Sequence, residues 1–260
     1  MCYNSAHDEL FLADLTNDVV RSMHLRDNAV DLLDVYKVSA DNENTTPIIC
    51  SVCHMRDTDT LLVCSGEVSK TSSNQWLVAL SRNGSDWSEA HRVQIQGTVK
   101  LCGSFALSDS RVLVGEYGST YMELFRVESG PRVAHSRIQL LEHYLDFSAT
   151  SSSVTLVATC FKTDKWVRVY RLLGDWLEEL AYIRFKKKEP CALLWLDDRI
   201  LLVETKNADS SAIIALEFVG TQLLRRHEFN SCNVYRWCTA NNGIAIVEIP
   251  SKDLLHFSFS

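Results

Sequence analysis

The chain has 260 residues, of which 46% are hydrophobic and 23% charged, and its formal net charge is −7. This composition is typical of a globular protein with one large domain or two small ones, and it excludes whole-chain disorder and collagen-like or low-complexity classes. Because 33 acidic residues outnumber 26 basic ones, the overall field repels phosphate backbones, and we expect no nucleic-acid partner.

From the sequence we expect neither a membrane span nor a secretory signal. The longest stretch without Asp, Glu, Lys or Arg, residues 147–161, is rich in Ser and Thr and shorter than the roughly 18 to 20 apolar residues of a membrane helix. The first residues, MCYNSAHDE, have neither a cationic start nor an apolar region. Nine scattered cysteines favour reduced, buried thiols over a disulfide framework. We therefore expect a cytoplasmic protein with no membrane partner.

Six apolar runs of β-type residues share one pattern. In chain order they are Leu10–Asp14, Leu61–Ser65, Val112–Glu116, Thr155–Thr159, Ile200–Glu204 and Ile244–Glu248. Their starts lie 51, 51, 43, 45 and 44 residues apart, and a short polar cluster suited to a tight turn precedes each run. This periodicity predicts six repeated supersecondary units.

Each period contains three further candidate strands around its run. A second β-rich segment follows the run, and four of these segments are followed by a glycine, namely Gly84, Gly130, Gly174 or Gly220. A hairpin turn needs a positive φ angle at such a position. A third segment follows the hairpin, and another apolar segment precedes the polar turn. The repeats therefore predict four-stranded antiparallel units at approximately residues 1–40, 47–96, 99–141, 144–186, 190–230 and 232–260.

Six such units predict an all-β fold, a six-bladed β-propeller in a single domain over residues 1–260, whose last blade is incomplete. Blade one resembles an NHL or YWTD-type repeat through Asp14 and Asn17 before an apolar strand, and the other five blades lack this pair. The units are WD40-like in strand number, but the Gly-His and Trp-Asp pairs of WD40 repeats are absent. The resemblance extends over the whole chain at the level of the β-propeller superfamily. It implies no particular function, because propellers serve as scaffolds, lectins, lyases and hydrolases.

Cys50, Cys53 and His54 match the C-x-x-C-H pattern of covalent haem attachment. On a strand, however, positions three apart point to opposite faces, so both thiols cannot meet one haem edge. As a zinc half-site the pair lacks a second pair at usable spacing. We interpret the two cysteines as packed core thiols and expect neither a metal nor a cofactor.

Acidic residues recur at the fifth position of the repeated runs. They are Asp14, Glu116, Glu204 and Glu248, and Ser65 and Thr159 occupy the other two runs. Equivalent strands of the repeats run in the same direction, so we expect these positions to ring one face. Trp87 and Trp176 follow hairpin turns and are the tryptophans expected to be exposed. The pattern predicts either solvated strand ends or an acidic rim that, together with the two tryptophans, attracts a basic protein partner.

The sequence favours a non-catalytic protein-interaction module or scaffold, without catalytic residues. It contains no G-x-S-x-G elbow, P-loop, G-x-G-x-x-G or H-E-x-x-H motif. One alternative is a metal-assisted, lactonase-like hydrolase, but the starts of the innermost strands offer only Asp146 and Asn233 as oxygen ligands. Another is a glycan-binding propeller, because Ser81–Trp87 is similar to the Asp-box of sialidase-like propellers. The run Lys186–Lys188 predicts a solvated loop, with an anion site as the alternative.

Overall fold

The computed structural model describes residues 1–24, 32–39, 45–68, 73–95, 101–107, 110–116, 118–127, 133–140, 142–150, 152–161, 164–207, 210–231, 234–240, 243–248 and 254–258. In this part of the chain the backbone forms strands β1 to β23 and one short 3-10 helix, Arg56–Thr58, and no α-helix. None of its helical structure has the length and apolar character needed to cross a membrane. The prediction of an all-β chain is confirmed for these residues.

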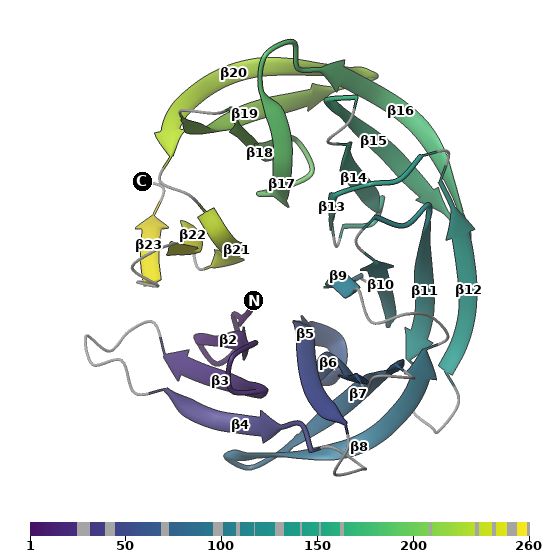
Figure 1. Cartoon of the computed structure of the whole chain (residues 1–260), viewed down its shortest axis with the longest axis vertical. Coiled ribbons are helices and arrows are strands. Elements are labelled where there is room, and N and C mark those ends of the chain that lie inside the picture. The colour runs from purple at the N-terminus through teal and green to yellow at the C-terminus, as the bar shows by residue number, and fades with distance from the viewer. Residues whose placement is uncertain are drawn as a thin grey trace. The chain divides into compact units, whose positions relative to one another are not determined.

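The strands form five four-stranded sheets and, among the described residues, one three-stranded sheet (Figure 1). The first sheet contains β1 (Cys2–Asn4), β2 (Glu9–Asp14), β3 (Val19–His24) and β4 (Leu33–Lys37). The second contains β5 (Thr46–Met55), β6 (Thr60–Val68), β7 (Ser73–Asn83) and β8 (Asp86–Ile95). The third contains β9 (Leu101–Ala106), β10 (Arg111–Glu116), β11 (Tyr121–Val127) and β12 (Val133–Gln139).

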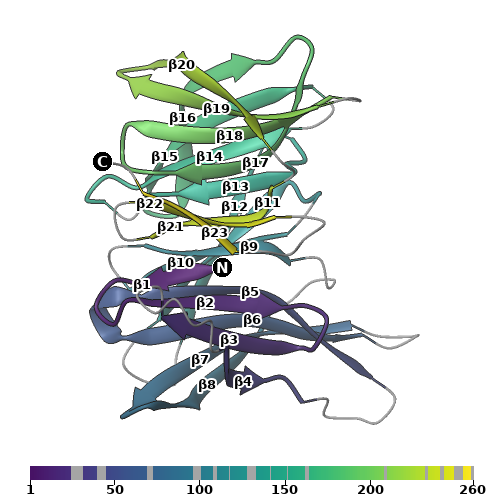
Figure 2. The same ribbon diagram turned by 90° about the vertical axis from the view of Figure 1, so that its left-hand side faces the viewer.

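The remaining three sheets follow in chain order. The fourth contains β13 (Asp146–Ala149), β14 (Leu156–Phe161), β15 (Trp166–Leu173) and β16 (Trp176–Arg184). The fifth contains β17 (Glu189–Trp195), β18 (Ile200–Lys206), β19 (Ser211–Val219) and β20 (Gln222–Ser231). The three-stranded sheet contains β21 (Val234–Ala240), β22 (Gly243–Glu248) and β23 (Leu254–Ser258). Consecutive strands of a sheet pair antiparallel, as Figure 2 shows for the fourth and fifth sheets.

Each repeated apolar run forms the second strand of its sheet. These strands are β2, β6, β10, β14, β18 and β22. In the fourth and fifth sheets the register is equivalent, since the fifth residue of the run pairs with the third residue of the next strand, Arg168 or Ile213. In the first sheet it pairs with Val19, the first residue of β3. The repeat read from the sequence therefore corresponds to a repeat of sheets.

The predicted hairpin glycines join the third and fourth strands of their sheets. Gly84, Gly174 and Gly220 have φ angles of +66°, +64° and +61°, and a Cβ atom at each would meet no heavy atom within 4 Å. Glycine is therefore favoured at these positions by the backbone conformation and not by lack of space. The predicted turns are confirmed at these three glycines, and Gly130 lies outside the described residues.

The chain divides into two compact units. The first unit comprises Met1–Val112 with Arg126–Ala134, and the second comprises Leu113–Phe125 with His135–Ser260. Within the first unit, the first two sheets share a core that includes the buried Phe11, Val20, Val52, Leu61 and Val78. Within the second unit, the fourth and fifth sheets share a core that includes the buried Ala158, Val167, Leu193, Val203 and Ile214. Full burial stabilises a Val or Leu side chain by about 1.5 to 3 kcal/mol relative to exposure.

Candidate functional site

The fifth residue of the repeated runs is the last residue of its strand in some sheets and lies inside the strand in others. Strands β2, β10 and β22 end at it, whereas β6, β14 and β18 continue for at least one residue beyond it. Ser65, Thr159 and Glu204 lie inside these longer strands and are at most 2% exposed. The expectation that every such residue ends its strand in solvent is therefore wrong for these three, because each strand continues beyond the residue and the side chain is buried by its neighbours.

Asp14 ends β2 and organises the turn that follows it. Its Oδ1 accepts hydrogen bonds from the backbone N–H groups of Thr16 at 3.0 Å and Asn17 at 3.2 Å, and its Oδ2 accepts one from Asn17 Nδ2 at 2.8 Å. Arg21 lies 3.0 Å from Oδ2. Burial alone would raise the pKa of Asp14, but these hydrogen bonds and the charge of Arg21 together lower it. The carboxylate thus acts locally as a turn cap.

Glu204 holds its carboxylate inside the second unit, where its residue is 1% exposed. Its Oε1 lies 3.7 Å from Lys206 Nζ, and its Oε2 lies 3.5 Å from Cys191 Sγ. Burial and the charge of Glu204 raise the pKa of Cys191 to about 12, so this thiol stays protonated. Glu204 consequently presents no charge to solvent.

The other residues predicted to form the acidic rim are only partly described. Glu116 ends β10 and Glu248 ends β22, but their side chains lie outside the described part of the structure. The role of this rim in binding a partner stays a prediction. Of the two predicted innermost-strand ligands, Asp146 accepts a hydrogen bond from the backbone N–H of Leu193 at 2.9 Å, and Asn233 lies outside the described residues.

The two tryptophans expected at the surface differ. Trp176 is 54% exposed at the start of β16, which confirms its predicted exposure. The Trp87 side chain is half-buried. The Arg82 guanidinium lies 4.5 Å from its ring centroid, and the Phe11 ring packs edge-on against it with the centroids 5.6 Å apart. The prediction of an exposed Trp87 is therefore wrong, and Arg82 covers a face that a sugar ring would need.

Cys50 and Cys53 are buried on β5, and neither forms a disulfide. Burial raises the pKa of Cys53 to about 12, so it is protonated at neutral pH. These observations confirm the interpretation of packed core thiols. Among the described residues, no group of three or more His, Cys, Asp or Glu side chains is placed to hold a metal ion.

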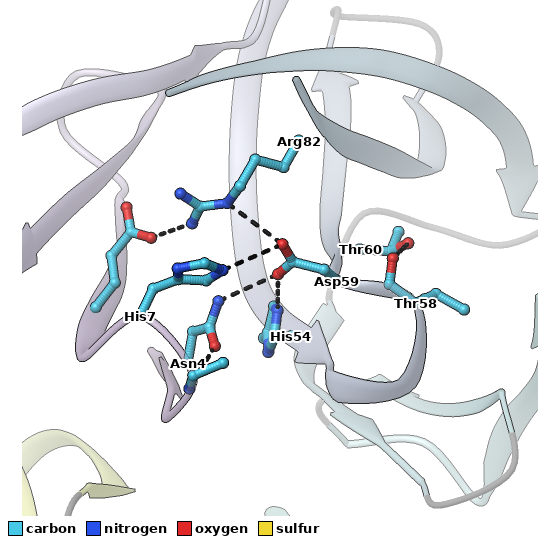
Figure 3. Close-up of polar contacts among 9 residues, drawn as sticks. Asn4, His7, His54, Thr58, Asp59, Thr60 and Arg82 are labelled. Carbon is cyan, nitrogen blue, oxygen red and sulfur yellow. Dashed lines mark hydrogen bonds and ion pairs between the residues drawn. The ribbon is translucent and has the colours of Figure 1, made fainter. Parts of the chain in front are cut away.

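His54, the third residue of this motif, belongs to a polar cluster that the sequence did not reveal. Its centre is Asp59, which follows the 3-10 helix in the left-handed conformation, with φ +45° and ψ +47°. Asp59 Oδ1 lies 2.9 Å from His54 Nε2 and accepts a hydrogen bond from Asn4 Nδ2 at 3.2 Å (Figure 3). Its Oδ2 lies 3.5 Å from His7 Nε2 and 3.4 Å from Arg82 Nε. We call Asn4, His7, His54, Asp59 and Arg82 the Asp59 cluster.

The cluster combines buried and half-exposed groups. The His54 side chain is 3% exposed, whereas those of His7 and Asp59 are 46% and 37% exposed. Burial lowers the pKa of His54 even though Asp59 favours its charged form. Burial alone would raise the pKa of Asp59, but the His54 hydrogen bond and the charges of Arg82, His54 and His7 together lower it. At neutral pH, His54 is therefore neutral and donates Nε2–H to an ionised Asp59.

The Asp59 cluster joins three segments of the first unit. Asn4 and His7 belong to the β1–β2 segment, Asp59 to the β5–β6 turn, and Arg82 to β7, where Arg82 also pairs with the buried Glu9. Both carboxylate oxygens of Asp59 already face groups of the chain itself. The arrangement therefore suits a structural joint between the first two sheets.

Three exposed aromatic side chains lie on the fourth strands of the fourth and fifth sheets. Trp176 and Tyr182 face opposite sides of the fourth sheet, because their cross-strand partners Leu173 and Arg168 are five residues apart on β15. Trp176 and Tyr182 on β16 are 54% and 59% exposed, and Phe229 on β20 is 52% exposed. We call these three residues the outer-strand aromatics. In Figure 1, β16 and β20 are the outermost strands of the second unit's two four-stranded sheets. Large aromatic side chains of this kind are the usual anchors of protein interfaces.

Comparison with known proteins shows a likeness in structure. No family model matches the chain, and no curated protein sequence matches it. A functionally unknown protein from Desulfotomaculum acetoxidans has a TM-score of 0.67 and 10% identity over 98% of this chain and 80% of its own. The β-propeller domain of Cps50 (Swd1) from Myceliophteria thermophila has a TM-score of 0.58 and 12% identity over 99% of this chain and 96% of its own. The chain has a β-propeller fold.

A further solved propeller carries an enzyme name. A protein from Bacteroides uniformis, provisionally assigned as a 6-phosphogluconolactonase, has a TM-score of 0.62 and 13% identity over 96% of this chain and 82% of its own. At such identities the likeness shows the fold, and propellers of one architecture differ in function. The β-propeller fold predicted from the sequence is thus confirmed, and the function has to be argued from the residues of this propeller.

Proposed function

We propose that the chain is a single six-bladed propeller domain, with the three-stranded sheet as its last blade, and that it acts as a non-catalytic protein-interaction module in the cytoplasm. The observation that carries the function is the exposure of the outer-strand aromatics. Exposed tryptophan, tyrosine and phenylalanine side chains lose water-contacting apolar area when a partner covers them, which stabilises the complex.

The matched position in the first unit supports this assignment. Trp87 and Trp176 both stand near the start of the fourth strand after a hairpin glycine, but Arg82 and Phe11 cover Trp87. Trp176 remains more than half exposed. The first unit thus covers the ring of Trp87 with its own side chains, whereas the second unit leaves the Trp176 side chain available to a partner.

The experiment compares the full chain with the variant Trp176→Ala/Tyr182→Ala/Phe229→Ala as bait in a lysate of the native source cells. The control variant Leu15→Ala/Leu33→Ala removes two exposed apolar side chains of the first unit. We expect a specific partner to be captured by the wild-type and control chains and lost from the triple variant, as quantified by mass spectrometry. Equal capture by all three chains contradicts the proposal, provided that circular dichroism shows each variant to be folded.

We further propose that a basic protein partner binds the acidic strand ends. This set no longer includes Glu204, which is buried. Asp14, Glu116 and Glu248 end their strands, and their charges would attract a cationic protein faster at low salt. The variant Glu116→Gln/Glu248→Gln should therefore slow association with the captured partner at low ionic strength. An unchanged rate, measured by surface plasmon resonance, removes the acidic rim from the proposal.

The metal-assisted lactonase alternative has less support from the residues. The Lys206 ammonium lies 3.7 Å from the buried Glu204 carboxylate, and Asp146 already accepts a backbone hydrogen bond. A cation beside Glu204 would be repelled by Lys206, so the described residues fit such an ion poorly. A lactone hydrolysis assay with added divalent cations, run on the wild-type chain and on Asp146→Asn, discriminates the two functions. Turnover that disappears in Asp146→Asn would favour the hydrolase.

A further inference from the structure

We propose that the end of the fourth sheet binds a short acidic peptide segment of a partner protein. This inference rests on the proposed interaction function and adds the chemistry of the partner. It concerns Trp166, Arg168, Tyr182, Arg184, Lys186 and Lys187, which we call the Trp166 surface.

Aromatic and cationic side chains alternate on neighbouring strands of this surface. Trp166 on β15 pairs across the strands with Arg184 on β16, and Arg168 pairs with Tyr182. The Trp166 and Tyr182 rings meet edge-on with centroids 5.0 Å apart. The guanidinium carbons of Arg168 and Arg184 lie 5.8 Å and 5.5 Å from the Trp166 centroid. These ring contacts orient the two arginines without neutralising their charge.

The charges of the surface are only partly compensated. Arg168 pairs with Glu142 at 3.0 Å and with Glu179 at 2.6 Å, and Lys188, the next lysine along the chain, pairs with Glu228. Arg184, Lys186 and Lys187 are exposed and have no ion pair within the part of the chain that the structure describes. Three cations without an ion pair among the described residues therefore stand within four consecutive residues of a chain whose net charge is −7.

The chemistry of the surface selects carboxylates together with an apolar side chain. A guanidinium binds a carboxylate through two parallel hydrogen bonds, and ammonium groups add point charges. Tyr182, at 59% exposure, offers an aromatic face beside these cations. An extended segment with acidic residues around an aromatic or aliphatic one would satisfy both properties.

The surroundings favour a short peptide over a nucleic acid. Glu178 and Glu179 on β16 and Glu228 on β20 limit the cationic area. Because charges are screened beyond about 8 to 10 Å at physiological salt, a short segment responds mainly to the local cations. A long polyanion would extend over the acidic remainder of the chain and be repelled there.

The experiment uses the full chain and the fluorescein-labelled peptide Asp-Asp-Phe-Asp-Glu-Phe-Asp-Asp in fluorescence anisotropy. We expect binding that Lys186→Glu/Lys187→Glu weakens by about tenfold or more, and that rising salt also weakens. The control Lys37→Glu/Arg126→Glu makes the same change in net charge at exposed residues of the first unit. It should change the affinity by less than about twofold. Tyr182→Ala, which leaves the charges intact, should weaken binding as well.

Three results would overturn the inference. If the control weakens binding as much as the lysine variant, the attraction is general and not local to the Trp166 surface. If an RNA oligonucleotide of equal charge binds more tightly and displaces the peptide, the site is one for nucleic acid. If the wild-type chain does not bind the peptide, the acidic-peptide inference fails, while the capture experiment with the outer-strand aromatics still decides whether the chain is an interaction module.

Discussion

The Asp59 cluster of the first unit and the Trp166 surface of the second both contain charged and ring-bearing side chains. They differ in how many of their charged groups are paired within the chain. In the Asp59 cluster a single carboxylate faces four polar groups of the chain, and His54 and Arg82 are largely buried. On the Trp166 surface, exposed cations stand without acidic partners among the described residues. Internally satisfied charges hold segments together, whereas uncompensated exposed charges contribute little to folding and remain available for binding.

The most direct test of this difference is to replace Asp59, the residue at the centre of the Asp59 cluster. Asp59→Ala leaves the buried His54 Nε2–H without its acceptor, removes the carboxylate 3.4 Å from Arg82 Nε and puts alanine in a left-handed conformation, while Arg82 keeps its ion pair with Glu9. We expect the free energy of unfolding to fall by about 1.5 to 3 kcal/mol, the range for hydrogen bonds to charged groups. Urea denaturation followed by circular dichroism measures the loss. Asp57→Ala, at an exposed position two residues earlier, is the matched control, and an equal loss there would show that Asp59 has no special structural role.

A second test asks whether a buried carboxylate of the second unit behaves like the Asp59 cluster. Glu204→Gln keeps the shape of the side chain but removes the charge that faces Lys206 and Cys191. We expect a loss of about 1 kcal/mol in the free energy of unfolding. Asp14→Asn, at the equivalent but partly exposed position, retains a side chain that can cap the turn and should cost less. Equal effects in thermal melts would show that the difference in burial between the two carboxylates does not matter.

The pH dependence of stability tests the Asp59 cluster without a large structural change. His54, which faces Asp59, Arg56 and Arg82, has a folded pKa below its ordinary value of 6.5. The unfolded chain therefore binds a proton before the folded chain does, and stability should decline as the pH falls below about 6.5. The lowered pKa of Asp59, below 3.8, has the same sign and acts at more acidic pH.

The measurement for this prediction is urea denaturation of the wild-type chain and of His54→Gln from about pH 8 to about pH 5. The variant lacks the imidazole, so its stability should vary less with pH over this interval. His7 also faces Asp59, at 46% exposure, and His7→Gln serves as the control. A pH profile that His54→Gln leaves unchanged contradicts the assignment of a neutral, buried imidazole.

The smallest effect is expected for the exposed residues of the second unit. Lys186→Glu/Lys187→Glu and Trp176→Ala should each change the free energy of unfolding by less than about 0.5 kcal/mol, as is usual for surface substitutions. Thermal melts of the purified variants measure this directly. A loss as large as that of Asp59→Ala would mean that these residues support the fold, and it would remove the contrast between the two regions.

Much of the fold could be predicted because its signals are local. Alternating apolar residues and turn-forming glycines such as Gly174 and Gly220 depend on neighbours in the sequence, and the six apolar runs were correctly predicted as equivalent strands. The Asp59 cluster could not be found in this way. Asn4, Asp59 and Arg82 belong to three separate segments with no common spacing, and only the pairing and packing of β1, β5, β6 and β7 bring them together.

The sequence by itself determined which residues occupy equivalent places in the repeat, because period and turn chemistry are properties of the chain. The tertiary structure determined whether the side chain at each of these places is buried or exposed and which groups it contacts. Asp14 and Glu204 share one position, yet β2 ends at Asp14 while β18 continues to Lys206, so one carboxylate caps a turn and the other is buried. Trp87 and Trp176 differ in the same manner, since Arg82 and Phe11 cover only the first. Exposure depends on strand length and on neighbouring sheets, and a local sequence pattern contains neither.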